Sequence, residues 1–166
     1  MERRWFRSTP ALDETIRERF EPTWCEAAAG RLDAWAETAP GALALTVVLD
    51  QLPLNMFRGE ARAFATGDRA VETALRAIGR GLDGELPRDR VAFLYMPLMH
   101  SEDIAHQDLA VRLFEAAGLE DNVRFARHHR DLIRCFGRFP HRNAILGRPS
   151  TPEELAYLAS KDAFTG

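Results

Sequence analysis

Apolar residues recur at helical spacing through most of the sequence, and this pattern constrains the fold more than any other feature. Leu12, Ile16 and Phe20 lie four residues apart after Pro10, which is typical of one buried face of a helix. The only run rich in β-branched residues, 46–49, lies inside a longer helical window. The sequence therefore predicts an all-α fold.

Proline, glycine and capping residues divide this pattern into about eight helices joined by short turns. We expect helices to start at or near Pro10, Pro22, Thr38-Pro40, Asp68, Pro87, Ser101, Asp121 or Asn122, and Thr151. The last start is the clearest, because Thr151-Pro152-Glu153-Glu154 combines a capping box with proline at the first helical position. Pro53 is expected to end or kink the helix before it. Short turns predict antiparallel neighbours.

Length and composition predict a single globular domain. The chain has 166 residues, of which 46% are hydrophobic and 28% charged, and it shows no repeat and no linker-like stretch. We expect an N-terminal extension over 1–8 and one domain over 9–166. No apolar run is long enough for a membrane span, and no signal-peptide core follows the N-terminus, so we expect a cytoplasmic protein. We also expect it to be a monomer. Cys25 and Cys135 are then expected to be free and mostly buried.

The expected core follows the apolar faces of these helices. We predict that its mostly buried members include Leu43, Leu45, Val48, Leu49, Val71, Leu75, Leu94, Leu98, Leu109, Leu113, Phe125, Leu132 and Phe136.

Positive charge is concentrated in one segment. Residues 124–148 hold seven arginines against the single acid Asp131, although the whole chain carries a net charge of −3. The acidic balance argues against a nucleic-acid binder, and the segment is a candidate site for an anion or an acidic partner. The alternative is that these arginines pair with acidic helices elsewhere in the chain.

His129 lies on the apolar face of the helix in this segment, in line with Phe125, Leu132 and Phe136. It is expected either to donate to a carbonyl or carboxylate in the core or to line an internal pocket.

A second polar group is His100-Ser101-Glu102-Asp103, followed by His106. Glu102 and His106 are spaced to share a helix face, as ligands of di-metal sites do, but no second Glu-x-x-His motif is present. Ser101 as a helix cap is the simpler interpretation. We predict no metal and no other cofactor.

The turn over 138–143 is dense in functional groups. Arg138, Arg142, His141 and Asn143 follow Gly137 around Pro140, and they are placed either to clamp a carboxylate or phosphate or to bind carbonyls at helix ends. Neither a phosphate-binding glycine loop nor a nucleophile elbow is present.

Four strings, taken together, are similar to one known family. They are Val48-Leu49-Asp50-Gln51-Leu52-Pro53, Asn55-Met56-Phe57-Arg58-Gly59, Pro97-Leu98-Met99-His100-Ser101-Glu102 and Phe136-Gly137-Arg138-Phe139-Pro140-His141-Arg142-Asn143. The chain resembles a bacterial domain-of-unknown-function family (nine-two-four) over residues 9–160. The resemblance implies a compact, tetratricopeptide-like helical array and no established activity. His129, Arg142, Asn143, Gly147 and Arg148 match positions of the family pattern, whereas Leu54 stands where the family usually has arginine.

The sequence is compatible with three functions. The first is a binding module for a small anionic or mixed-charge ligand or an acidic peptide. The second is a hydrolase or transferase that acts on an anionic substrate with His and Glu as acid–base residues, and the third is a purely structural or assembly protein. The candidate ligand-binding residues are Asp50, Gln51, Arg58, His100, Glu102, His129, Arg138, His141, Arg142 and Asn143. The helix ends that carry them either converge into one cleft or serve only as structural ties. We expect neither nucleic acid nor membrane as a partner.

Overall fold

The computed structural model describes residues 9–161 and 163–164, and in these residues it contains helices and turns but no strand. The all-α prediction is confirmed. The chain forms two compact units, residues 1–97 and 98–166, with the boundary at Pro97 inside helix α5. The single domain expected over 9–166 stays a prediction. The expected extension over 1–8 lies outside the described residues.

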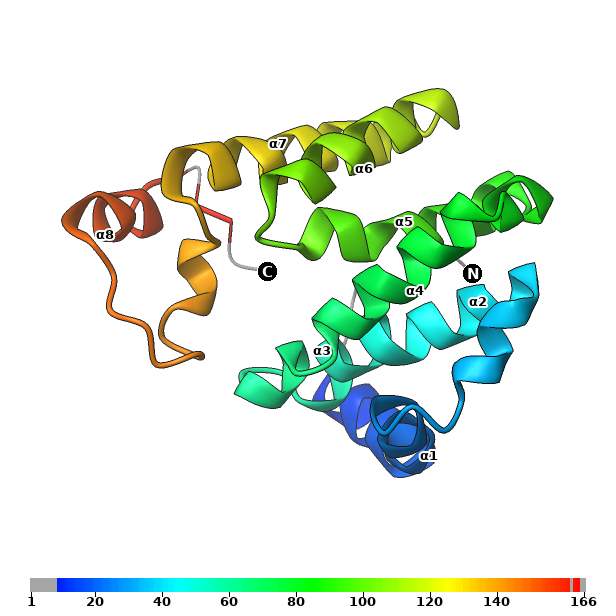
Figure 1. Ribbon diagram of the computed structural model, residues 1–166. Coiled ribbons are helices and arrows are strands. Elements are labelled where there is room, and N and C mark those ends of the chain that lie inside the picture. Colours follow the sequence, from blue (N-terminus) through cyan, green and yellow to red (C-terminus); the bar gives the residue numbers. More distant parts are fainter. Residues whose placement is uncertain (1–8, 162, 165–166) are drawn as a thin grey trace. The chain divides into compact units, whose positions relative to one another are not determined.

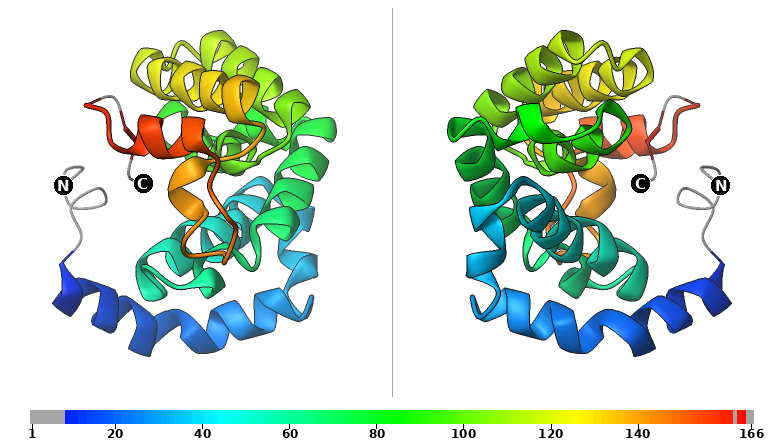
Figure 2. Two further views of the ribbon diagram at one scale, coloured as in Figure 1. Left: turned by 90° about the vertical axis from the view of Figure 1, so that its left-hand side faces the viewer. Right: turned by 90° about the vertical axis from the view of Figure 1, so that its right-hand side faces the viewer.

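The first unit begins with one long helix where the sequence predicted two. Helix α1 spans Pro10–Ala28, with Thr9 as its N-cap, and Pro22 lies inside it. The prediction of a new start at Pro22 was wrong, because residues on both sides of this proline continue one helix (Figures 1 and 2). A 3₁₀ turn η2, Asp33–Glu37, then leads to helix α2, Ala39–Thr46, which Thr38 caps.

The predicted disturbance before Pro53 takes the form of a π-helical turn. This turn, η3, spans Val47–Gln51 and connects α2 to the short helix α3, Leu52–Met56. Proline lacks the backbone N–H that a regular helix needs, so widening of the preceding turn accommodates it without ending the helical path.

The remaining elements of the first unit are 3₁₀ turn η4, Ala61–Phe64, helix α4, Gly67–Gly79, 3₁₀ turn η5, Leu82–Glu85, and most of helix α5, Arg88–His100. Helix α1 packs on α3, and α2 packs on α4. One hydrogen-bond relay joins α1, the residue before α4, and the π turn η3. The Trp24 indole N–H donates to Thr66 Oγ1 at 3.0 Å, and the Thr66 hydroxyl donates to the Leu49 carbonyl at 2.6 Å. Thr66, rather than the predicted Asp68, precedes α4.

The second unit contains helix α6, Ile104–Ala116, helix α7, Glu120–Phe136, 3₁₀ turn η6, Pro140–Arg142, and helix α8, Pro152–Leu158. Helices α6 and α7 lie side by side as a hairpin (Figures 1 and 2). Asp103 caps α6 in place of the predicted Ser101, and α7 begins before the predicted Asp121 or Asn122. The capping box at Thr151 and Glu154 is confirmed.

Of the thirteen expected core residues, seven are buried and five are partly buried, but three predictions of burial were wrong. Phe125 is 47% exposed, and both Cys25 and Cys135 are exposed. Helix α7 turns Val123, Ala126, His129, Leu132 and Ile133 inward. Among the described helices, none has the length and apolar character needed to cross a bilayer.

Candidate functional site

Polar side chains of the second unit form a continuous network around the segment that joins α7 to α8. Its members are Glu102, Arg138, Asn143, Arg148 and Glu154, and we call them the carboxylate–arginine network. The αL conformation of Gly137, with φ of 71°, ends α7 and turns the chain into this segment.

Glu102 anchors one end of the network. Its carboxylate accepts from both terminal nitrogens of Arg148, at 2.6 and 2.9 Å, and from the Phe139 backbone N–H at 2.8 Å. Burial by itself raises the pKa of Glu102, but the hydrogen bonds from Arg148 and Phe139 outweigh it and hold that pKa below its usual value. Glu102 is therefore a carboxylate with its oxygens already engaged.

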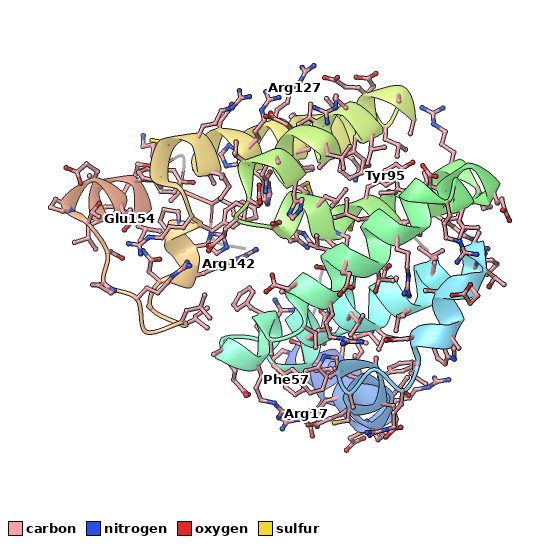
Figure 3. All side chains as sticks on the ribbon, in the orientation of Figure 1. Arg17, Phe57, Tyr95, Arg127, Arg142 and Glu154 are labelled. Atoms are coloured by element: carbon pink, nitrogen blue, oxygen red, sulfur yellow. The ribbon has the colours of Figure 1, made fainter. Side chains whose placement is uncertain are left out.

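Asn143 and Glu154 form the buried centre of the network, 1% and 2% exposed. Asn143 accepts from Arg148 Nε at 3.0 Å and donates to Glu154 Oε2 at 3.0 Å. Arg138 donates to Glu154 at 2.7 and 2.9 Å, and these bonds, against the opposing effect of burial, lower the pKa of Glu154 to about 2. Figure 3 labels Glu154 on α8 and Arg142 on η6. The Arg148–Glu102 and Arg138–Glu154 ion pairs are thus linked through the side-chain amide of Asn143. Together they connect the residues before α6 with the start of α8.

Four imidazoles gather beside this network. His100, His128 and His141, together with His129, form what we call the histidine cluster, which surrounds Phe139 and Phe164. The His129 ring centroid lies 6.4 Å from that of His100, 6.2 Å from that of His128 and 5.4 Å from that of Phe139. The His141 ring lies 5.6 Å from Phe139 and 5.1 Å from Phe164.

His129 is the most buried of these rings, 4% exposed, and its Nδ1 lies 2.8 Å from the Phe125 carbonyl oxygen. A carbonyl only accepts, so the proton is on Nδ1 and the ring is the neutral donor tautomer. Burial, followed by the charge of His100, lowers the pKa of His129 to about 3. The expectation of an inward histidine that donates to a carbonyl is confirmed.

Arg142 supplies the positive charge of the cluster. Its guanidinium carbon lies 4.4 Å from the centroid of the Phe139 ring. Burial, and then the charge of Arg142, lower the pKa of His141 to about 4. The Nδ1 atom of His141 is buried and has no hydrogen-bond partner among the described residues. Two neutral imidazoles therefore lie close to one fixed cation.

The predicted site residues fall into both units. His100, Glu102, His129, Arg138, His141, Arg142 and Asn143 belong to the second unit, where the contacts above bring them together. Asp50, Gln51 and Arg58 belong to the first unit. There Gln51 donates to Asp50 at 2.6 Å, and Arg58 donates to Asp13 at 2.9 Å. One cleft that includes both groups stays a prediction.

The candidate residues predicted from the sequence lack two partners of the network, one histidine of the cluster, His128, and the two phenylalanines that the cluster surrounds. Arg148 was noted only in the charged segment and the family pattern, and Glu154 only as a capping residue. Glu154 does cap α8, accepting from the Thr151 N–H at 2.8 Å, and binds Arg138 with the same carboxylate. Phe139 and Phe164 carry no polar signal, so nothing in their spacing indicates the histidines around them.

Two histidines of the second unit, His129 and His106, are poorly suited to act as general bases. A general base works best with a pKa near the operating pH, and the pKa of His129 is about 3. Ser101 Oγ lies 2.9 Å from His106 Nδ1, so His106 is engaged within its own turn. Within the described residues, no three His, Cys, Asp or Glu side chains are grouped so as to hold a metal ion. The absence of a metal stays a prediction.

Comparisons with known proteins identify relatives of the chain without assigning an activity. The model of a family described as bacterial protein of unknown function (DUF924) matches residues 1–162. A solved structure of a protein of unknown function from Agrobacterium tumefaciens is 43% identical, with a TM-score of 0.90. The match covers 95% of this chain and 89% of that one. No curated protein matches.

Proposed function

We propose that this chain, which belongs to the bacterial family of unknown function DUF924, is a helical binding module. Its ligand is a small anion such as phosphate or a carboxylate. The ligand binds in the second unit, at the histidine cluster beside Arg142. The observation that carries the proposal is that Arg142, His129 and His141 all lie against the Phe139 ring. Burial and the Arg142 charge lower the pKa of both histidines there.

An anion fits this arrangement because its negative charge opposes the effect of the Arg142 charge on the two histidines. The charge of Arg142 contributes to the lowered pKa of both histidines, and a bound negative charge acts in the opposite direction. Anion binding then raises the pKa of His141 and takes up protons. Linkage requires the affinity for the anion to increase as the pH falls from 7 toward 5.

A small anion is favoured over an acidic peptide because the arginines along α7 are already paired. Arg127 lies 2.7 Å from Glu115, and Arg134 lies 2.9 Å from Asp108. Arg138 and Arg148 are engaged by Glu154 and Glu102. The positive face that a long acidic chain would follow is thus largely neutralised.

Inorganic phosphate is the first probe, with chloride at equal ionic strength as the reference. We expect phosphate to raise the melting temperature of the protein and to shift the His141 ring signals in NMR spectra. The Arg142→Gln variant should lose both effects. Arg112→Gln removes one exposed charge from α6 in the same unit and should keep them.

Equal responses of the two variants to phosphate would contradict the proposal, because they would indicate general ionic stabilisation. If Arg142→Gln unfolds too readily for melting curves, the NMR titration of the wild-type rings decides. A phosphate response without any change at His141 would also overturn the proposed location.

A further inference from the structure

The first unit contains an open groove that the proposed anion site does not use. It has a volume of about 900 Å³ and lies between α1, η2, α2 with its π turn, and the start of α5. This volume is within the range of small-molecule sites. Apolar side chains dominate its wall, among them Ile16, Phe20, Leu43 and Val48. The groove therefore offers an apolar ligand a place to bury much of its surface.

Two large apolar side chains on the groove wall remain in contact with solvent. Leu12 is 37% exposed and Trp35 is 40% exposed, although an indole and an isobutyl group both gain free energy from burial. Exposed apolar side chains gathered in one concave place indicate a binding surface more strongly than the same residues scattered singly.

The charges on the wall indicate which end group such a ligand carries. Arg19 and Arg90 line the groove together with one acid, Glu85. Other arginines of this unit form ion pairs, for example Arg58 with Asp13 and Arg80 with Glu37. Neither Arg19 nor Arg90 pairs with a carboxylate of the described residues, and Arg19 lies 5.3 Å from the centroid of the Phe20 ring. The groove thus carries cations without matching internal acids.

We propose that this groove binds a free fatty acid, with its alkyl chain along the apolar wall and its carboxylate at Arg19 or Arg90. Charge complementarity selects this occupant over a neutral or cationic apolar molecule. A second copy of the chain is less suited to the groove. It would have to place groups of opposite charge against Arg19, Arg90 and Glu85 across the interface. All residues that line the groove belong to the first unit, so this proposal does not rest on the anion site of the second unit.

Laurate, used below its micelle-forming concentration, is the probe. Trp35 lies on the groove wall, so laurate should change the tryptophan fluorescence of the full-length protein with a saturable dependence on concentration. The Trp35→Phe variant should lose most of this change. Dodecyltrimethylammonium has an equally long chain and a positive head group, and we expect it to bind at least tenfold more weakly than laurate.

Arginine variants test the head-group contact. Arg19→Ala or Arg90→Ala should weaken laurate binding by roughly threefold or more, as expected for loss of a partly exposed charge contact. Arg76→Ala removes an exposed arginine of α4 that does not line the groove, and it should leave the affinity unchanged. Leu12→Glu places a carboxylate on the wall and should abolish binding.

Three outcomes would overturn the proposal. One is the absence of a saturable laurate signal, and another is equal affinity for laurate and dodecyltrimethylammonium. The third is dimerisation of the unliganded protein that Leu12→Glu removes, because a second copy would then cover the groove. None of these outcomes bears on the phosphate response of Arg142, so the two proposals fail separately.

Discussion

His129 shows how the fold of the second unit changes the chemistry of a single side chain. Its ring is buried, donates to the Phe125 carbonyl, and keeps a pKa of about 3. The unfolded chain has a histidine pKa near 6.5, so between these two values the unfolded state binds more protons than the folded state. Stability contributed by the neutral ring is complete above about pH 6.5 and is lost as the pH falls.

We predict that the free energy of unfolding decreases on acidification below pH 6.5, and that His129→Phe reduces this slope. The reduction approaches about 1.4 kcal/mol per pH unit, because one fewer group takes up a proton on unfolding. Urea unfolding between pH 7 and 5 measures it. An unchanged slope in His129→Phe would show that the wild-type ring is already protonated in the folded state.

Asn143 is the side chain on which the carboxylate–arginine network depends most. It is 1% exposed and bonds to Arg148, Ser150 and Glu154. Asn143→Ala leaves buried polar groups without their partner and should lower the free energy of unfolding by about 2 kcal/mol. Asn122→Ala, at the start of α7, should change it by less than about 0.5 kcal/mol. Equal urea midpoints for the two variants would contradict the structural role of the network.

The sequence predicted some of these residue environments and missed others for physical reasons. His129 was expected to lie inward, and it does. Phe125 was assigned to the same face by its spacing from His129, Leu132 and Phe136, but α7 turns Val123 and Ala126 inward. Ala126 and Ala110 of the neighbouring α6 are both fully buried. Close helix packing selects small side chains at the contact, a preference that a pattern of large apolar residues does not reveal.

At the scale of elements, Gly41 sets the approach of α2 to η2. A Cβ atom added at Gly41 would lie 2.0 Å from the Trp35 carbonyl oxygen, so either the helix or the turn has to move. We predict that Gly41→Ala lowers the free energy of unfolding by about 2 kcal/mol or more. Because the same turn carries Trp35, the variant should also alter tryptophan fluorescence.

The control for this prediction is Gly79→Ala, at the end of α4. A Cβ atom there meets nothing within 4 Å, so the change should stay within about 1 kcal/mol and favour the alanine variant. Denaturant unfolding of both variants measures the difference. Equal changes of stability in the two variants would show that the contact with Trp35 does not decide the outcome at Gly41.

Element boundaries were predictable where a local interaction sets them and uncertain where the tertiary structure does. Thr151 caps α8 through a box of four neighbouring residues, which the sequence displays directly. Pro22 disrupts only its own turn, and packing of α1 on α3 keeps the helix continuous through it. The π turn before Pro53 likewise has no distinct sequence signal, since its residues also suit a regular helix.

At the scale of the whole chain, charge is uneven along the sequence but is paired in the second unit. Residues 124–148 carry seven arginines and one acid. Asp108 and Glu115 of α6 face this segment and pair with Arg134 and Arg127 at 2.9 and 2.7 Å. The sequence shows the excess of arginine but not which acids neutralise it, because that depends on the α6–α7 packing.

We therefore predict that the wild-type protein passes through a heparin column at roughly 0.15 M salt, where charges beyond about 8 Å are screened. The double variant Asp108→Asn with Glu115→Gln removes the acids that neutralise the α7 arginines and should be retained. Glu14→Gln with Glu18→Gln changes the net charge equally on exposed positions of α1, and this variant should still pass through. If both double variants are retained alike, net charge alone governs the interaction, whereas retention of only the α6 variant shows that the pairing between α6 and α7 keeps polyanions from binding.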